Sequence, residues 1–517
     1  MSINYKNTVL GIEFGSTRIK ATLIDTEHKP IASGGYEWEN SFVNGVWTYD
    51  LADAVKGLRE CYADLVKNLG EAPETFGAIG ISGMMHGYLP FDSDWNQIAE
   101  FRTWRNTITG EAAEKLTEKF GFNIPQRWSI AHVYQAILNG EEHIKKLAHV
   151  TTLAGYIHYL CTGVNAVGMN EGSGMFPVDS ASLTYNREML EKFDSISGLD
   201  VKAADFLPEL LTAGKSAGVL TAEGAKLFDP TGTLKPGVPM APPEGDAGTG
   251  MVATNSVRVR TGNVSAGTSD FSMLVLDHEL GVHREIDVFN TPAGLPVAMV
   301  HCNNCTSDIN AWVNLFGEFA QLIGAPVSKG ELFTKLFNKA LEGDADCGDL
   351  LSYNYFSGEG VTDIDEGRLI FARKPDSAFT LANFMRTHLV SALATLKLGM
   401  DILSKVENVP CDKMTGHGGY FKTPGVGQRI LSAAINAPVT VTETAGEGGP
   451  YGMALLAAFM LWKDEGETLE DYLDNKVFAG AKSSTVMASE EEVKGFAAFA
   501  ESYKNAFEIE RLATKLF

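Results

Sequence analysis

Cysteine is scarce in this chain, and long apolar runs are missing. Six cysteines among 517 residues are too few for a disulfide scaffold. No run reaches about 18 uninterrupted apolar residues, so no transmembrane helix and no membrane partner are predicted. The first residues, MSINYKNTVLGIEFG, lack the basic-then-apolar layout of a signal peptide. These absences predict a cytoplasmic protein.

Positive charge is also in short supply. Lys and Arg total 42 against 65 Asp and Glu, which gives a net charge of −23 at pH 7. Such a chain repels a phosphate backbone, so we expect no nucleic-acid partner. A phosphorylated small molecule is not excluded, because a few backbone N–H groups can hold phosphate in an acidic protein. With 44% hydrophobic residues, the composition is that of a globular protein with a large core.

One cysteine pair has a spacing that suits a metal. His301, Cys302 and Cys305 form the sequence HCNNC, which is half of a typical zinc site. No second close Cys/His pair accompanies it. Buried or helix-start reduced thiols are therefore the preferred interpretation, and zinc is the lesser one.

Two strand–turn–strand segments of like design begin the two halves of the chain. VLGIEFG and IKATLID flank the turn Gly15-Ser16-Thr17, and VRVRTGNVSAGTSDFSMLVLD contains Gly267-Thr268-Ser269 about half a chain length later. This weak repeat predicts two domains of similar α/β design, residues 1–254 and 255–517. Apolar periodicity predicts further elements. They are a strand over 76–81 and helices over 54–69, 109–121, 131–148, 381–405, 425–435 and 451–462.

The two turns are candidate phosphate sites. A turn of glycine and small hydroxyl residues exposes N–H groups that can grip phosphate oxygens. Such turns also form for geometric reasons alone, but two in matching places favour phosphate contact. The glycines of GHGGYFKTPG would let a backbone approach a flat ligand or its phosphates, with a plain connection as the alternative. The candidates are Gly15, Ser16, Thr17, Gly267, Thr268, Gly418 and Gly419.

Two more candidates lie in the first half. In SGMMHG, His86 can hydrogen-bond a polyol hydroxyl while Met85 packs beside carbon; a structural histidine is the alternative. Asp246 lies in the predicted loop APPEGDAGTGM, where the halves join. Phosphoryl transfer to an alcohol needs a group that accepts the hydroxyl proton, and Asp246 suits that role, with helix capping as the alternative. We expect Glu244 to be a solvated neighbour.

In combination these segments resemble the FGGY family of carbohydrate kinases, closest in motifs to xylulokinases. The family's two phosphate-loop hairpins resemble GIEFGSTRIKATLID and NVSAGTSDFSML, and its GGGDNAAGA-type catalytic segment resembles APPEGDAGTGMV. Its YLSGER stretch is similar to LLSYNYFSGE, and its nucleotide signature to GHGGYFKTPGVGQRIL with GEGGPYGMALLA. The GQMHG motif of xylulokinases resembles SGMMHG. The matches occur in order from about residue 8 to residue 460.

The resemblance implies a fold and a set of roles. The fold is a duplicated ribonuclease-H-like domain of the actin and hexokinase type, with the active site in the cleft between a sugar-binding half, 1–254, and an ATP-binding half, 255–517. Asp246 matches the catalytic base, and Met85 and His86 match residues that contact the ketose. The two turns match the phosphate loops, and Gly418 and Gly419 match the adenosine-side glycines.

Two departures from the family pattern bear on the function. Glu13 stands where the family usually has Asp facing the Mg²⁺–phosphate region, so Glu13 and Asp246 are candidates for metal contact. Trp104 begins WRNTI where xylulokinases have WND(G)R, and it is a candidate sugar contact. The expected activity is ATP- and Mg²⁺-dependent phosphorylation of a ketopentose at its terminal hydroxyl, with D-xylulose favoured.

Alternatives stay open at this point. L-ribulose or another sugar or polyol is the other substrate hypothesis, and an actin-like ATP-binding switch or regulator is the hypothesis without kinase activity. Dimers are common among relatives of such chains, which leaves a homodimer open.

Overall fold

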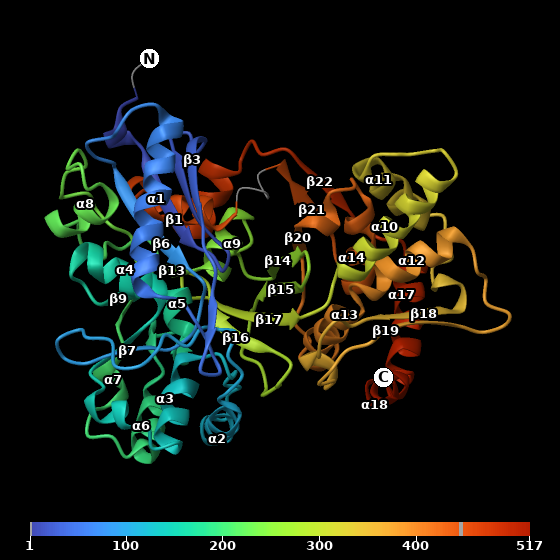
Figure 1. The fold of residues 1–517 in the computed structure, drawn as a ribbon, viewed down its shortest axis with the longest axis horizontal. Helices are drawn as coiled ribbons and strands as arrows, with labels where there is room; N and C mark the ends of the chain where they lie inside the picture. Colours follow the sequence, from blue (N-terminus) through green and yellow to red (C-terminus); the bar gives the residue numbers. More distant parts are fainter. Residues whose placement is uncertain (1–2, 444–447, 517) are drawn as a thin grey trace. The chain divides into compact units, whose positions relative to one another are not determined.

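The computed structural model describes residues 3–443 and 448–516. The chain forms two compact units, each a mixture of helices and strands (Figure 1). The first unit contains Met1–Val257, Val288–Val297 and Glu447–Gly480, and the second contains Arg258–Asp287, Ala298–Gly446 and Ala481–Phe517. The first unit therefore takes one of its segments from late in the sequence.

The first unit is built on a five-stranded sheet in the order β13-β6-β1-β2-β3. β1 and β2 form an antiparallel hairpin that β3 extends, while β6 and β13 add in parallel on the other side of β1. Every residue of β1 and β6 is buried, as expected for strands covered on both faces. The strand bounds are β1 Val9–Phe14, β2 Arg18–Ile24, β3 Pro30–Glu37, β6 Ala78–Gly83 and β13 Glu244–Gly245.

Helices cover both faces of this sheet, and glycines let them approach closely. A Cβ on Gly11 of β1 would overlap the backbone of α15 (Gly449–Trp462), and one on Gly34 of β3 would overlap the backbone of α1 (Leu51–Leu69). By the register of the three strands, the two glycines project to opposite faces. Helix α1 therefore covers one face (Figure 1) and α15 covers the other.

Helix α15 is apolar on all sides. Its residues from Gly449 to Phe459 are buried, because the helix is enclosed by β1, β6 and α9 (Asp246–Ala253). Its 14 residues are fewer than the ~20 that a bilayer-spanning helix needs. Within 3–443 and 448–516, no helix has the length and apolar character to cross a membrane.

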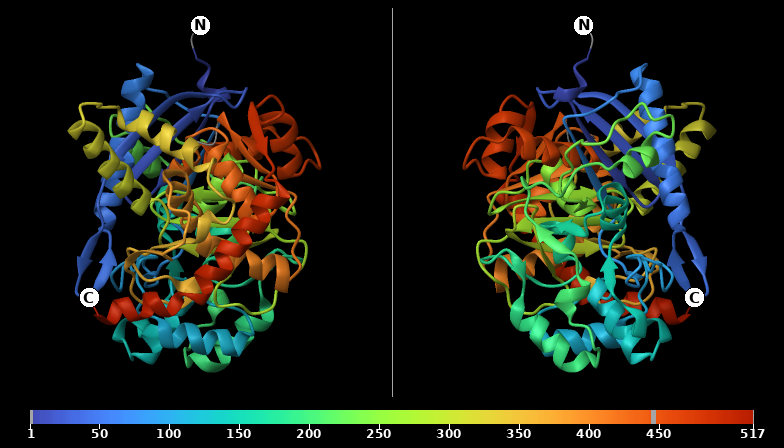
Figure 2. Two further views of the ribbon diagram at one scale, coloured as in Figure 1. Left: turned by 90° about the vertical axis from the view of Figure 1, so that its right-hand side faces the viewer. Right: turned by 90° about the vertical axis from the view of Figure 1, so that its left-hand side faces the viewer.

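A second apolar core of the first unit gathers around Trp128, Phe176 and Phe193. Short two-stranded ribbons accompany it, and the β4–β5 hairpin forms a separate ribbon (Figure 2). The helix bounds are α2 Gly110–Phe120, α3 Ser129–Leu138, α4 Leu153–Thr162, α5 Met169–Ser173, α6 Arg187–Ser197, α7 Ala203–Phe206, α8 Ala222–Phe228 and α16 Leu469–Tyr472. The ribbon strands are β4 Ser41–Val43, β5 Val46–Thr48, β7 Leu89–Phe91, β8 His149–Thr151, β9 Ala166–Gly168, β10 Val178–Asp179, β11 Thr184–Tyr185 and β12 Glu209–Leu211.

The second unit repeats the plan of the first. β14 and β15 form an antiparallel hairpin, and β20 pairs with β14 in parallel, as β6 does with β1. The full sheet has seven strands in the order β16-β17-β15-β14-β20-β21-β22. The predicted α/β fold with a repeated hairpin is confirmed. The strand bounds are β14 Thr261–Ala266, β15 Asp270–Val275, β16 Asp287–Asn290, β17 Pro296–Cys302, β18 Leu350–Asn354, β19 Leu369–Arg373, β20 Lys413–His417, β21 Val439–Thr442 and β22 Ser483–Val486.

Two predicted helices are wrong in extent. The helix predicted over 131–148 corresponds to α3, which ends at Leu138, just before Gly140, whose φ of 64° is left-handed. The predicted helix 381–405 is interrupted, because Leu393 leaves the helical conformation at φ −113° and ψ 4°. The remaining bounds are α10 Ser307–Leu322, α11 Lys329–Ala340, α12 Leu381–Ser391, α13 Ala394–Asp401, α14 Val426–Ile435, α17 Glu490–Asn505 and α18 Phe507–Leu516.

The contact between α15 and α9 predicts a glycine requirement. A Cβ on Gly452 of α15 would overlap the Thr249 carbonyl of α9. Overpacking of this kind costs typically about 1–3 kcal/mol or more, which exceeds the ~1 kcal/mol that alanine gains in helix propensity. We expect Gly452→Ala to lower the free energy of unfolding measured in urea. Gly250→Ala in α9, where nothing lies within 4 Å, is the control and should be neutral or stabilising. Equal losses in both variants would contradict the prediction.

Candidate functional site

Aromatic side chains fix the first predicted phosphate turn, between β1 and β2. Trp38 Nε1 donates to the Gly15 carbonyl at 2.7 Å, and the Tyr49 hydroxyl donates to the Ser16 carbonyl at 2.6 Å. The Trp38 and Tyr49 rings stack with centroids 4.3 Å apart. The turn is therefore anchored through its carbonyls, with Ser16 and Thr17 at its tip, which is the preorganisation that a phosphate loop needs.

Met85 and His86 follow β6 on a sharply turned segment. His86 has φ 69°, a left-handed value uncommon outside glycine. Its Nδ1 lies 3.0 Å from the Gly174 carbonyl, and its ring stacks on Trp128 with centroids 6.2 Å apart. A carbonyl only accepts, so Nδ1 carries the proton in the neutral ring and Nε2 is the acceptor. Met85 and His86 are both buried, so the segment is packed within the first unit.

Asp246 is the first residue of α9 and not part of a loop, which corrects the prediction from sequence. Its Oδ1 accepts a hydrogen bond from the Met85 N–H at 3.2 Å, which joins the two predicted motifs. The residue is exposed to solvent. Nevertheless the surrounding protein desolvates the carboxyl and raises its pKa to about 6, against the lowering effect of the Met85 N–H. An accessible carboxyl with a raised pKa is typical of a functional site.

Glu13, near the end of β1, lies close to Asp246. A Cβ on Gly449, the first residue of α15, would overlap the Glu13 carboxyl, so this carboxyl lies against the N-terminus of α15. The partial positive charge of a helix N-terminus favours an anion there. Burial, followed by the charge of Asp246, raises the pKa of Glu13 to about 7, while Lys20 lowers it. The two carboxyls thus interact electrostatically.

The Glu13–Asp246 pair fits a Mg²⁺ ion. Carboxylate oxygens are hard ligands, and a cation would relieve the repulsion that raises the pKa of Glu13. Among the described residues no group of three or more His, Cys, Asp or Glu is placed to hold a metal. Such a two-carboxylate arrangement suits Mg²⁺, which usually keeps several waters and binds through one or two carboxylates plus phosphate oxygens.

Two further buried acids, which the sequence analysis missed, lie next to Asp246. The expectation that Glu244 is solvated is wrong: it is 1% exposed in β13, and its Oε2 accepts from the Glu171 N–H of α5 at 3.1 Å. Burial raises the pKa of Glu244 to about 8. Burial also raises the pKa of Glu171 well above its usual range; the Thr152 hydroxyl lowers it, and the charges of Asp246 and Glu244 raise it further. Nothing in the local sequence signals this cluster, because the fold alone brings the segments together.

Trp104 connects the predicted sugar and phosphate residues. It is 37% exposed, and its Nε1 donates to the Ser16 Oγ at 3.3 Å. Asn106 in the same segment is buried and hydrogen-bonds the Trp47 backbone, so it has a structural role. Trp104 is thus an exposed side chain in direct contact with the turn.

The second predicted phosphate turn is held by the start of α10. The Gly267 carbonyl accepts from the Thr306 N–H at 2.9 Å, and the Thr268 carbonyl accepts from the Cys305 N–H at 2.9 Å. Cys302 and Cys305 are buried and carry free thiols. Burial raises the pKa of both thiols, so they stay protonated. The backbone around the cysteine pair thus supports the turn.

Gly418 and Gly419 lie at the end of β20. Gly418 has φ 99°, and a Cβ there would overlap the Ala266 carbonyl at the end of β14. A Cβ on Gly419 would meet nothing within 4 Å. The backbone at Gly419 is therefore open to an approaching ligand, and Gly418 is required by packing against the strand that leads into the second turn.

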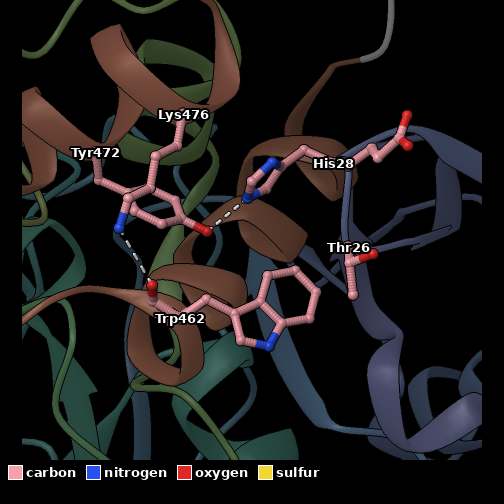
Figure 3. Close-up of a pocket in the computed structure, with 6 residues that line it drawn as sticks. Thr26, His28, Trp462, Tyr472 and Lys476 are labelled. Atoms are coloured by element: carbon pink, nitrogen blue, oxygen red, sulfur yellow. Dashed lines mark hydrogen bonds between the residues drawn. The ribbon is translucent and has the colours of Figure 1, made fainter.

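A cavity of about 600 Å³ in the first unit is remote from these residues (Figure 3). His28 Nε2 and the Tyr472 hydroxyl lie 2.5 Å apart at its wall. α15 runs from Gly449, beside Glu13, to Trp462 at the cavity, and its 14 residues at ~1.5 Å each span roughly 20 Å. None of the predicted site residues lines this cavity. Its lining residues are Thr26, Glu27, His28, Trp462, Tyr472 and Lys476.

Comparison with known proteins covers nearly the whole chain. The FGGY family of carbohydrate kinases matches with its N-terminal domain over residues 8–253 and its C-terminal domain over 262–461. A xylulose kinase of Haemophilus influenzae is 22% identical over 521 residues, covering 96% of this chain and 98% of that protein. An autoinducer-2 kinase of Escherichia coli is 22% identical over 282 residues, covering 51% of this chain and 50% of that protein. The solved structure of a ligand-bound xylulose kinase from Lactobacillus acidophilus has a TM-score of 0.79 at 16% identity, covering 97% and 98% of the two chains.

The buried Glu244 carboxyl predicts a pH-dependent contribution to stability. Its pKa is about 8 in the folded protein and ~4.3 in an unfolded chain, so folding favours the protonated form. The contribution is fully present below pH ~4.3 and is lost as the pH rises through about 8. Glu244→Gln mimics the protonated form at every pH. In EDTA, the Tm of Glu244→Gln minus the Tm of wild type should be at least ~3 °C higher at pH 8.5 than at pH 5.5.

Glu60→Gln, at an exposed position of α1, is the matched control and should shift Tm equally at both pH values. A pH-independent difference between Glu244→Gln and wild type would contradict the assignment of a buried protonated carboxyl.

Proposed function

Since the chain belongs to the FGGY family of carbohydrate kinases, we propose that it phosphorylates the terminal hydroxyl of a ketopentose, with D-xylulose, which gives D-xylulose 5-phosphate, as the favoured substrate. Kinases of this family use ATP as the phosphoryl donor. The observation that carries the proposal is the exposed Asp246 carboxyl, held by the Met85 N–H next to His86.

In the proposed reaction Asp246 is the general base. The substrate oxygen forms a bond to the γ-phosphorus, the bond from that phosphorus to the β–γ bridging oxygen breaks, and ADP leaves with the electron pair. The hydroxyl proton passes to the Asp246 carboxylate. A pKa near 6 makes this carboxylate a stronger base than an ordinary aspartate while it remains ionised at pH 7. The Met85 N–H fixes the orientation of the carboxylate.

ATP binding is assigned to the turns and to the second half of the chain. Residues 1–254 would hold the sugar, and residues 255–517 would hold most of the nucleotide. The turns Gly15-Ser16-Thr17 and Gly267-Thr268 would meet phosphate oxygens through backbone N–H groups. Their carbonyls are already engaged, which supports this role. The open backbone at Gly419, beside Gly418, suits the adenosine.

Glu13 and Asp246 would hold Mg²⁺. When bound, the ion balances the negative charge of the phosphates and of the two carboxyls. Glutamate in place of aspartate at position 13 extends the carboxyl by one methylene, and the N-terminus of α15 is where that longer side chain lies.

Sugar recognition is assigned to Met85, His86 and Trp104. His86, whose Nδ1 donates to the Gly174 carbonyl, would hydrogen-bond a sugar hydroxyl through its other ring nitrogen. The half-exposed Trp104 indole offers an apolar face for the carbon skeleton. Xylulose kinase and autoinducer-2 kinase among the relatives act on different molecules by name, so L-ribulose and other sugars or polyols are the alternatives.

Removal of the proposed base tests the mechanism. Asp246→Asn retains the shape of the side chain but cannot take the hydroxyl proton. Because general-base assistance contributes typically ~10²–10⁴ in rate, kcat should fall by at least ~10²-fold with the Tm unchanged or higher. Asp94→Asn, at an exposed position, is the control and should keep wild-type kcat. Wild-type turnover in Asp246→Asn would overturn the assignment.

A substrate panel with a histidine variant tests the sugar assignment. At equal sugar concentration, ADP release should be faster with D-xylulose than with L-ribulose, aldoses, aldonates or polyols. His86→Ala should raise KM for the ketose at least ~10-fold and leave KM for ATP within ~2-fold, because one lost hydrogen bond to a buried acceptor costs ~1–3 kcal/mol. His278→Ala, partly exposed in the second unit, is the control. Equal changes in both KM values would mean that His86 is structural.

A further inference from the structure

Helices α5 and α9 both begin with a residue that cannot cap them. The N-cap of α5 is Gly168 and that of α9 is Gly245, and neither helix receives a hydrogen bond from a side chain of its own N-cap. The first N–H groups of a helix have no partner within the helix and need acceptors from elsewhere. The start of α5 is buried, and so is Gly248 in the first turn of α9, so the acceptors for these N–H groups must come from the protein.

Each helix is capped by a side chain from the start of the other. Asn170 of α5 accepts the Gly248 N–H of α9 on its Oδ1 at 2.9 Å. In return Glu244, which directly precedes the glycine N-cap of α9, accepts the Glu171 N–H of α5 on its Oε2 at 3.1 Å. These two hydrogen bonds are called the crossed cap below.

Glycine is needed where the crossed cap forms. A Cβ on Gly168 would overlap the Glu244 carboxyl, and a Cβ on Gly245 would overlap Met85. A Cβ on Gly248 would lie 2.5 Å from the Asn170 Cγ. The absence of side chains at these positions therefore admits the capping groups from the neighbouring segment.

Asn170 is itself held from its other side. Its Nδ2 donates to the Asn290 carbonyl at 2.8 Å, and the Asn290 N–H donates to Ser173 Oγ at 2.9 Å. Ser173 Oγ in turn donates to the Asn170 carbonyl at 2.8 Å. The amide of Asn170 thus has a fixed orientation, with its oxygen directed at α9.

From this geometry we infer that Asn170 is a positioning residue for Asp246. Asp246 is the first helical residue of α9, directly after the N-cap Gly245, so its position depends on how the start of α9 is held. Asn170 holds the Gly248 N–H two residues further on, and the Met85 N–H holds the Asp246 carboxylate. The crossed cap therefore fixes the place from which the Asp246 carboxylate meets a substrate hydroxyl. This inference rests on the proposed role of Asp246 as the base.

Two variants of Asn170 separate positioning from support of the fold. Asn170→Ala removes the acceptor of the Gly248 N–H, so the first turn of α9 is held less firmly and Asp246 is positioned less precisely. We expect kcat for phosphorylation of the preferred sugar to fall at least ~10-fold, with KM for sugar and ATP within ~2-fold. Asn170→Asp, protonated in its buried position, keeps an oxygen acceptor for the Gly248 N–H and a hydroxyl donor for the Asn290 carbonyl, and should recover kcat to within ~3-fold of wild type.

Thr221→Ala is the matched control for the fold. Thr221 is the N-cap of α8 in the first unit, where its Oγ1 accepts the Gly224 N–H at 2.9 Å and donates to the Cys161 carbonyl at 3.0 Å. The variant should lower Tm about as much as Asn170→Ala does, while kcat stays within ~2-fold of wild type. Equal losses of kcat in Thr221→Ala and Asn170→Ala would show that Asn170 only supports the fold, and would overturn the inference.

Amide hydrogen exchange gives a readout that does not depend on activity. In the full-length protein, peptides covering 246–253 should exchange at least ~10-fold faster in Asn170→Ala than in wild type and stay protected in Asn170→Asp and Thr221→Ala. Unchanged exchange in Asn170→Ala would overturn the crossed cap. If Asp246→Asn loses activity while Asn170→Ala keeps full kcat, the inference fails and the proposed function stands; full activity in Asp246→Asn fails the proposed base itself.

Discussion

The packing of α15 against β1 is the contact on which the first unit depends. It is possible only because Gly11 and Gly452 carry no side chains where the helix meets β1 and α9. Through this contact the N-terminus of α15 reaches Glu13, and α9 is held with Asp246 at its start. The two acids proposed for phosphoryl transfer thus owe their proximity to a helix that lies far from both in sequence.

The acids around Asp246 share one electrostatic environment. Glu13, Glu171, Glu244 and Asp246 all have a raised pKa, and burial is the largest cause for each. Concentrated carboxyls cannot all ionise at once without a cation or a proton between them. The two proposed to meet ligands are Glu13, beside the phosphate turn, and Asp246, which is exposed to solvent. Glu171 and Glu244 are enclosed, and the Glu244 carboxyl accepts a backbone hydrogen bond. The same residue type therefore fills two roles according to its surroundings.

The hairpins, the parallel third strands and most helices follow from local pattern, because apolar alternation and small-residue turns are encoded within a few residues. The place of Asp246 between the halves and the family resemblance predict its role, but they do not predict the helix that it begins. The segment DAGTG has low helix propensity and is helical because α15 packs on it. Because Pro243 and Gly245 flank it, Glu244 is predicted from sequence to be exposed. Its burial comes from a two-residue pairing of β13 with β6, which no local pattern reveals.

The late position of α15 in the sequence affects how the chain can fold during synthesis. Gly11 and its apolar neighbours in β1 emerge from the ribosome long before Gly449–Trp462, the helix that covers them. One face of the first sheet therefore stays uncovered until most of the second unit has been translated. Such exposed apolar surface on a nascent chain invites aggregation and engages chaperones. The unit that begins synthesis first can thus complete its sheet packing only after most of the other unit has been made.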